Sequence, residues 1–324
     1  MKIVILGTGA YGMALSNIFS DSKCNVVMWT KFKEEKEMLD INRGNEKLIP
    51  NFELNENIEI TDDLDYALKN NDLVVIAIPA AFFRLVCEEV KNKIDKDTNI
   101  LIATKGIEQN TDKFMSQIVS EILNTNKIAV LSGPSFAVDI VKRNPIGVTI
   151  ATENDDLFKL CNDAINTHYI YIERSRDVEG VELCGSIKNV YAIIFGILDG
   201  LKLTDSTRAM LFKNIINEIQ NLLEKLDCKK NTALTYAGIG DLILTCTSDK
   251  SRNYKLGNMI GNKEEKVKID EYIKNTTIEG LYTLTSLHNI INNEKIECNS
   301  IKVLYNIMYR NGNITEIINY VVKK

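Results

Sequence analysis

The chain has no surplus of positive charge. Its 324 residues carry 39 Lys and Arg against 44 Asp and Glu, which gives a formal net charge of −5 and a pI near 5.4. Binding to a nucleic-acid backbone or to an anionic membrane depends on clustered Lys and Arg. We therefore expect neither nucleic acid nor a membrane surface as a partner, although local basic groups can still bind small anions.

The sequence also lacks any CxxC spacing. Its seven cysteines are odd in number and scattered along the chain. This pattern indicates neither a disulfide framework nor a zinc site. We expect buried free thiols in a reducing cytoplasm, and no metal.

Long hydrophobic runs are missing as well. The longest apolar stretches, residues 73–79 and 190–198, are shorter than the roughly 18 residues that a membrane span needs. The apolar run after Lys2 reaches Gly7 too soon to form the hydrophobic region of a signal peptide. We therefore expect a cytoplasmic protein without membrane insertion. Its length is enough for roughly two globular domains.

The first half of the chain alternates between strand-like and helical patterns. Apolar runs of strand length occupy residues 2–6, 25–29, 73–78, 99–103 and 127–132, and helical patterns lie between them, including residues 83–94 and 112–123. Such alternation predicts a mostly parallel sheet covered on both faces, which is a Rossmann-type doubly wound α/β domain. Residues 148–152 and 168–172 are candidates to extend this sheet.

The second half has a different character. From Val181 almost to the end, apolar residues recur at helical spacing, and strand-like runs are few. We predict a dinucleotide-binding domain over residues 1–177 and an all-α substrate-binding domain over residues 178–324. No Pro/Ser-rich linker separates them, so we expect the domains to pack around a shared cleft at the carboxyl ends of the strands.

A glycine-rich turn follows the first predicted strand. Gly7-Thr8-Gly9-Ala10-Tyr11-Gly12 matches GxGxxG directly before a predicted helix. In such turns the first glycine permits a tight bend, the second lets the backbone approach the pyrophosphate, and the third lets the helix pack closely. The turn predicts a bound dinucleotide. A turn without a ligand, or with another nucleotide, is the alternative interpretation.

No acidic residue follows the second predicted strand. The chain there reads Trp29-Thr30-Lys31-Phe32-Lys33, whereas a carboxylate at this position would bond the 2′-hydroxyl of NAD and repel the 2′-phosphate of NADP. Lys31 or Lys33 is placed to meet a phosphate. The sequence therefore favours NADP over NAD, unless these lysines are ordinary surface residues.

Two polar loops follow predicted strands in the same half. They are Thr104-Lys105-Gly106 and Ser132-Gly133-Pro134-Ser135-Phe136-Ala137. Both come at the carboxyl end of a strand, where this fold places its ligands. A solvent-facing lysine and a simple Gly-Pro turn are the alternative interpretations.

One lysine of the second half lies within an apolar helical pattern. The segment GVELCGSIKNV, residues 180–190, has small residues, Cys184 and Gly185, one turn before Lys188. These leave room for a flat ring beside the lysine. Partial desolvation favours the neutral form of a lysine and suits it to general acid or base catalysis. A lysine that extends from a helix edge into solvent is the alternative.

An acid and an arginine follow in the second half. Asp241 comes directly after two glycines, and Ser251-Arg252-Asn253 begins ten residues later. The planar guanidinium suits a phosphate, and Ser and Asn add neutral donors beside it. Together with two lysines and a nicotinamide-type turn, this set suits the reduction of a phosphorylated carbonyl compound.

Taken together, these motifs resemble the NAD(P)-dependent glycerol-3-phosphate dehydrogenases over nearly the whole chain. The motifs are GTGAYG at 7–12, TKG at 104–106, SGPSFA at 132–137, GVELCGSIKNV at 180–190, AGIGDLILTCTSDKSRN at 237–253 and IEG at 278–280. The departures are mild. Ala10 replaces a Ser or Thr of many members, and Cys184 and Ser186 replace other small residues.

The resemblance implies an enzyme that interconverts dihydroxyacetone phosphate and sn-glycerol 3-phosphate, a precursor of phospholipids. Hydride passes between nicotinamide C4 and the carbonyl carbon, and Lys188 is the general acid or base. Asp241 and Asn189 orient this lysine or the substrate hydroxyls, and Lys105 adds positive charge at the reacting end.

The resemblance also implies the binding residues. Arg252 and Asn253 hold the substrate phosphate with help from Ser251, and Gly133 and Ser135 line the substrate pocket, in which Lys105, Lys188 and Asp241 also take part. The cofactor contacts are Gly7, Gly9, Ala10, Tyr11, Gly12, Lys31, Lys105, Ala137, Arg252 and Glu279.

Two other functions are compatible with parts of this pattern. One is a reductase of another small keto or hydroxy acid on the same two-domain plan, with Arg252 on a carboxylate. The other is a sensor or scaffold that binds a dinucleotide without turnover, although the joint presence of Lys105, Lys188, Asp241 and Arg252 speaks against it. By analogy with two-domain dehydrogenases, we expect a homodimer.

Overall fold

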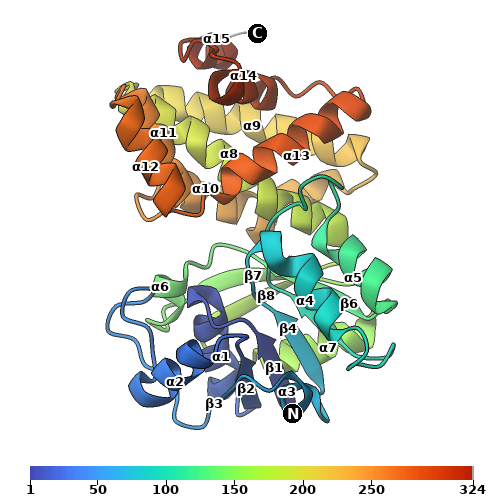
Figure 1. The fold of residues 1–324 in the computed structure, drawn as a ribbon. Helices are drawn as coiled ribbons and strands as arrows, with labels where there is room; N and C mark the ends of the chain where they lie inside the picture. Colours follow the sequence, from blue (N-terminus) through green and yellow to red (C-terminus); the bar gives the residue numbers. More distant parts are fainter. Residues whose placement is uncertain (323–324) are drawn as a thin grey trace. The chain divides into compact units, whose positions relative to one another are not determined.

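The structure, a computed structural model, describes residues 1–322 and divides the chain into two compact units (Figure 1). The first unit contains Met1–Lys105 and Met115–Val178, and the second contains Gly106–Phe114 and the chain from Glu179 onward. The functional domains at 1–177 and 178–324 remain a prediction, and the short segment Gly106–Phe114 crosses that boundary.

The first unit is built on one eight-stranded sheet in the order β3-β2-β1-β4-β5-β6-β7-β8. Neighbouring strands are parallel except β6 and β7, so β7 and β8 run opposite to the other six. The strands are β1 (Lys2–Leu6), β2 (Asn25–Trp29), β3 (Glu59–Thr61), β4 (Leu73–Ile76), β5 (Ile100–Ile102), β6 (Ile128–Ser132), β7 (Ile146–Ala151) and β8 (Ile170–Ser175). The predicted doubly wound, mostly parallel sheet is confirmed. Strand β3 was not predicted, because three residues are too few to show a periodicity.

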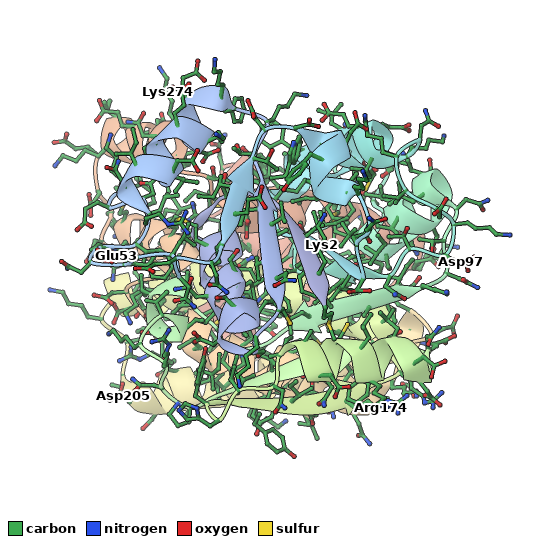
Figure 2. The ribbon with its side chains drawn as sticks, turned by 90° about the horizontal axis from the view of Figure 1, so that it is seen from below. Lys2, Glu53, Asp97, Arg174, Asp205 and Lys274 are labelled. Carbon is green, nitrogen blue, oxygen red and sulfur yellow. The ribbon has the colours of Figure 1, made fainter. Side chains whose placement is uncertain are left out.

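Helices and buried side chains complete this unit. The helices are α1 (Ala10–Asp21), α2 (Lys33–Asn42), α3 (Leu64–Leu68), α4 (Phe83–Val90), α5 (Met115–Leu123), α6 (Ala137–Ile140) and α7 (Asp155–Ala164). Alternate strand residues such as Ile3 and Ile5 share one buried cluster with Phe19 of α1 and Leu157 of α7, as the two-residue period of a strand requires. In Figure 2 Lys2 lies at the amino end of β1, and the charged Asp97 lies at the periphery.

Helix α5 begins later than the sequence predicts. The helical pattern was predicted to start at Asp112, but Asn110 and Asp112 have φ values of 72° and 55°, which no helix accepts. Phe114 forms an isolated bridge with Ile107, and both side chains belong to the buried cluster of the second unit. A tertiary contact therefore overrides the local pattern and transfers this segment to the second unit.

The second unit is helical, as predicted. It contains α8 (Val178–Gly200), α9 (Asp205–Lys225), α10 (Asp241–Cys246), α11 (Arg252–Gly261), α12 (Lys266–Asn275), α13 (Glu279–Asn293), α14 (Asn299–Tyr309) and α15 (Glu316–Val322), with a 3-10 turn η2 (Lys230–Leu234) and a π-helical turn η3 (Tyr236–Gly240). Within residues 1–322, α8 is the one helix long and apolar enough to cross a membrane, and its most apolar window is 100% buried inside the structure. This burial is that of a core helix.

Helices α8 and α11 touch through their backbones. A Cβ added at Gly196 would overlap the carbonyl oxygen of Tyr254, and one at Gly257 would overlap that of Ile193. Glycine at both positions lets the two helices approach more closely than side chains allow. This contact brings the start of α11 beside the middle of α8, where two of the predicted site residues lie.

Candidate functional site

The glycine turn lies where the strand order reverses. Leu6 at the end of β1 pairs with Trp29 of β2 on one side and with Ile76 of β4 on the other. Strands added after β4 extend the sheet in the opposite direction, so β1 and β4 form the topological switch point at which such sheets bind ligands. Gly7 has φ +119°, and a Cβ on it would lie 2.5 Å from the carbonyl oxygen of Ala77. The tight turn therefore requires this glycine.

Gly9 has a different reason to be glycine. A Cβ on it would meet no atom within 4 Å, so no neighbouring protein group requires its absence. Gly9 is also the N-cap of α1 and supplies no side-chain cap. The first-turn N–H groups of the helix have no intrahelical acceptor and carry the positive end of its dipole. An anion such as a pyrophosphate can approach this backbone closely.

Four of the predicted site residues of the first unit lie together. The Nζ of Lys105 donates to the carbonyl oxygen of Gly133 at 3.2 Å and lies 5.9 Å above the centre of the Tyr11 ring. The hydroxyls of Tyr11 and Ser135 are 3.1 Å apart, and the Ser135 hydroxyl donates to Gly133 at 3.0 Å. Because Ser135 has one hydroxyl hydrogen, Tyr11 is the donor in their contact. The TKG and SGPSFA loops are thereby joined to the first turn of α1.

Lys31 lies at the end of β2, as predicted, but it is not isolated. Its side chain is exposed and forms an ion pair with Glu89 of α4. A 2′-phosphate near Lys31 would therefore compete with a carboxylate that the local sequence did not reveal. This pairing weakens the argument that Lys31 selects NADP.

Lys188 and Asp241 form a buried ion pair. The Nζ of Lys188 lies 2.6 Å from Asp241 Oδ1, and the two side chains are 8% and 1% exposed. Lys188 is therefore not a lysine that extends into solvent. Charges this deeply buried need partners with good geometry, and the Thr245 hydroxyl, 3.3 Å from the same oxygen, is a further one. The sequence analysis missed Thr245. Its signal was the four-residue spacing from Asp241, which places both on one helix face.

A π-helical turn leads directly into Asp241. In η3, a Cβ on Gly238 would overlap the carbonyl oxygen of Ala233, so glycine lets the turn pack onto η2. The Thr235 hydroxyl accepts from the N–H of Gly238 at 3.2 Å and donates to the carbonyl of Thr232 at 2.7 Å. Single π-helical turns often occur at functional sites. Here the turn sets the position at which α10 and its carboxylate begin.

Cys246, the cysteine beside the Lys188–Asp241 pair, is a buried thiol of low reactivity. Cys246 is fully buried and its thiol lies 4.0 Å from the carbonyl oxygen of Lys188. Burial raises the pKa of the Cys246 thiol well above its usual value, although the Lys188 ammonium opposes this shift. Burial also raises the pKa of Cys161 to about 12. All seven cysteines are free thiols, and six are buried, as the sequence predicted.

A second polar group lies next to the ion pair, one residue along α8. Asn189 donates through Nδ2 to Glu279 Oε2 at 3.3 Å and accepts at Oδ1 from Asn253 Nδ2 at 3.0 Å. The Oδ1 of Asn253 accepts from the N–H of Gly280 at 2.9 Å. Three motifs that are far apart in the sequence, SIKN, SRN and IEG, therefore meet in one hydrogen-bonded group.

The remaining residues of the SRN motif open α11. Ser251 is the N-cap, and its hydroxyl accepts from the N–H of Tyr254 at 3.3 Å. Arg252 is exposed, and its carbonyl accepts from the Tyr272 hydroxyl at 3.2 Å. The motif thus places a guanidinium at the positive end of a helix dipole, where an anion is favoured. Within residues 1–322, no group of three or more His, Cys, Asp and Glu is arranged to hold a metal ion.

A nucleotide-type turn at the switch point of a parallel sheet, together with a helical unit that buries a Lys-Asp pair, defines the class of two-unit nicotinamide-dependent oxidoreductases. The family profiles are more specific. The N-terminal profile of NAD-dependent glycerol-3-phosphate dehydrogenase matches residues 2–158, and the C-terminal profile matches residues 177–319. The chain belongs to the NAD-dependent glycerol-3-phosphate dehydrogenase family.

Individual relatives agree with this assignment. A glycerol-3-phosphate dehydrogenase [NAD(P)+] of Clostridium botulinum is 33% identical over 95% of this chain and 93% of its own. One of Wolbachia is 33% identical over 99% of this chain and its full length. The crystal structure of glycerol-3-phosphate dehydrogenase from Coxiella burnetii matches with a TM-score of 0.92 and 29% identity, over 100% and 99% of the two chains. A D-mandelate dehydrogenase, 14% identical with a TM-score of 0.62, shares the fold alone.

Proposed function

We propose that this protein interconverts dihydroxyacetone phosphate and sn-glycerol 3-phosphate with NAD(H) or NADP(H). The observation that carries the proposal is the buried Lys188–Asp241 pair in a chain that matches the family over both halves. The relatives' names supply the substrate and cofactor class. A supply of glycerol phosphate for phospholipid synthesis, a cytoplasmic location and a homodimer form part of the same proposal.

The glycine turn fits a nicotinamide dinucleotide, because Gly9 leaves open space before a helix start without a side-chain cap. Gly7 and Gly12 shape the turn, and the N–H groups of Ala10 and Tyr11 are donors for the pyrophosphate. The cofactor, when bound, supplies or accepts the hydride at nicotinamide C4. The chain's own residues supply the proton and hold the substrate.

In the reducing direction, Lys188 gives a proton from Nζ to the substrate oxygen as hydride reaches the carbonyl carbon. The products are an alcohol and a neutral amine, and water returns the proton to the amine before the next turnover. In the oxidising direction, the neutral amine takes the hydroxyl proton. Asp241 holds the ammonium in one orientation through its 2.6 Å contact, and Thr245 restricts that carboxylate.

The substrate phosphate is bound by Arg252 and Asn253 at the start of α11, with Ser251 shaping the turn as its N-cap. Lys105 adds positive charge near Gly133 and Ser135, since Lys105 and Ser135 both donate to the carbonyl oxygen of Gly133. Ala137 and Glu279 complete the proposed cofactor contacts. In this proposal Lys31 favours NADP by binding its 2′-phosphate, for which the phosphate must compete with the carboxylate of Glu89.

The test is an assay of NADH and NADPH oxidation with dihydroxyacetone phosphate, with pyruvate as an unphosphorylated keto acid for comparison. We expect turnover with dihydroxyacetone phosphate and little with pyruvate. Equal or faster turnover of pyruvate favours the keto-acid reductase. Cofactor binding in a calorimeter without oxidation of either cofactor would identify a sensor and exclude the proposed enzyme.

A further inference from the structure

The four residues Gly280, Asn253, Asn189 and Glu279 form a closed hydrogen-bond relay in the second unit. The N–H of Gly280 donates to Asn253 at 2.9 Å, and Asn253 donates to Asn189 at 3.0 Å. Asn189 then donates to Glu279 at 3.3 Å. Because Glu279 and Gly280 are adjacent in the first turn of α13, the relay begins and ends at the same turn.

The direction of this relay is fixed by its two ends. A backbone N–H can only donate, and a carboxylate can only accept. Asn253 must therefore direct Oδ1 toward Gly280, and Asn189 must direct Nδ2 toward Glu279. The bond between the two amides follows from these constraints. If either amide flipped, two acceptors or two donors would face each other.

Burial makes the orientation costly to change. Asn189 and Asn253 are 5% and 7% exposed, so water cannot readily replace a lost partner. A Cβ on Gly280 would lie 2.6 Å from the carbonyl oxygen of Asn189 and 2.7 Å from Asn253 Oδ1. Only glycine lets the turn approach the backbone of Asn189 and the side-chain amide of Asn253 this closely.

We propose that the first turn of α13 is a positioning element that locks Asn253 as a hydrogen-bond donor to the substrate phosphate. The inference rests on the proposed function, in which Asn253 and Arg252 bind that phosphate. An amide NH₂ group carries two hydrogens, and the relay uses one of them. A phosphate dianion offers only acceptors, so a locked donor suits it, whereas a flipped amide presents a repelling oxygen. Glu279 and Gly280 act through Asn189 and Asn253.

The relay predicts an unusual response to exchanged amides and carboxylates. In Asn253→Asp, one carboxylate oxygen still accepts from Gly280, and the new oxygen faces Asn189, which must flip and direct its own oxygen at Glu279. In the double variant Asn253→Asp/Glu279→Gln, the introduced glutamine donates to Asn189, which in turn donates to the new aspartate. These two side-chain bonds therefore re-form in the reverse direction, while the N–H of Gly280 still donates to position 253. The double variant leaves the net charge unchanged, because the carboxylate has moved from one end to the other.

We expect Asn253→Asp to lower the Tm by several degrees, since it puts unpaired acceptors in a buried site. The double variant should recover the wild-type Tm within about 2 °C. Both variants should raise the KM for dihydroxyacetone phosphate at least about tenfold, because each loses one charge-assisted hydrogen bond to the substrate phosphate. Both should also lose the rise in Tm that inorganic phosphate, compared with chloride at equal ionic strength, produces in the wild type.

The matched control is Asn262→Asp, which adds the same charge just beyond the far end of α11 at an exposed position. It should leave the KM and the phosphate response unchanged. The proposal is overturned if the double variant keeps the low Tm or does not fold, if it regains the phosphate response, or if phosphate does not stabilise the wild type. A wild type that binds phosphate but does not turn over dihydroxyacetone phosphate contradicts the proposed reaction. It leaves the relay supported, because the Tm measurements with and without phosphate do not depend on turnover.

Discussion

The ammonium of Lys188 and the carboxylate of Asp241 meet at 2.6 Å in a part of the helical unit where each side chain is less than a tenth exposed. A pair in this position affects both catalysis and stability. It provides a proton donor, and it contains two buried charges, each of which is destabilising without the other. Removing either residue alone therefore changes stability as well as chemistry.

Lys188→Ala should lower kcat by about 10²–10⁴-fold, the usual contribution of a positioned acid or base. The single variant should also lose stability, of the order of 3–5 kcal/mol, because the buried carboxylate of Asp241 loses its oppositely charged partner. The double variant Lys188→Ala/Asp241→Asn separates the two effects. It should regain much of the stability in urea unfolding and remain inactive. Near wild-type kcat in a folded Lys188→Ala protein would remove Lys188 from its proposed role.

Thr245→Val should lower kcat about three- to tenfold with little change in the KM for dihydroxyacetone phosphate. The hydroxyl restricts the carboxylate of Asp241, and one neutral hydrogen bond contributes about 0.5–1.5 kcal/mol. Thr245→Ser keeps the hydroxyl and should recover most of the rate in the same steady-state assay. If Thr245→Ser is as slow as Thr245→Val, keeping the hydroxyl does not preserve the rate, and the positioning role of that hydroxyl is wrong.

Arg252→Ala should raise the KM for dihydroxyacetone phosphate by about 10–100-fold, because a charge-assisted contact to phosphate contributes about 1.5–3 kcal/mol. The side chain is exposed, so the Tm should hardly change. Lys268→Ala removes one exposed positive charge from α12, which packs on α11, and serves as the control. Equal effects of the two substitutions would indicate a diffuse electrostatic field in place of a phosphate site.

Lys31→Glu should shift the ratio of kcat/KM values from NADPH toward NADH, since a carboxylate at the end of β2 repels a 2′-phosphate. The ion pair with Glu89 adds a second expectation. Glu89→Gln frees the lysine and should shift the ratio toward NADPH. Unchanged ratios in both variants would place the 2′-position away from Lys31.

The acid stability of the first unit should depend on Asp21. Burial alone would raise the pKa of this carboxyl, but hydrogen bonds from Arg143, Asn55 and Tyr169 outweigh burial and hold it below its usual value. A lowered folded-state pKa contributes stability above the unfolded-state pKa, near 4, and this contribution disappears as the pH falls through the folded-state value. The Tm of Asp21→Asn should therefore lie below that of the wild type at pH 6, and the difference should shrink below pH 4. A constant difference would show that the effect is not ionic.

Much of the fold and many of the site residues could be predicted from local patterns. Strand periodicity and the positions of glycine and proline are encoded within a few neighbouring residues, and the doubly wound sheet and helical second half followed from them. The role of Thr245 and the start of α5 could not be predicted in this way, although the four-residue spacing of Thr245 from Asp241 is itself local. Thr245 matters because its partner Asp241 forms an ion pair with Lys188, which is distant in the sequence. Helix α5 begins late because Phe114 packs into the buried cluster of the second unit.

The sequence by itself determined the class of fold, the family, the nucleotide-type turn and the identity of Lys188 and Asp241 as a candidate pair. Only the tertiary structure decided that these two side chains meet while buried, that Lys31 is paired with Glu89, and that α13 orients the amides of Asn189 and Asn253. The physical reason is the range of the interactions. Periodicity and turn chemistry act between near neighbours, whereas hydrogen-bond direction and charge pairing depend on residues that folding brings together from 50 or more positions away.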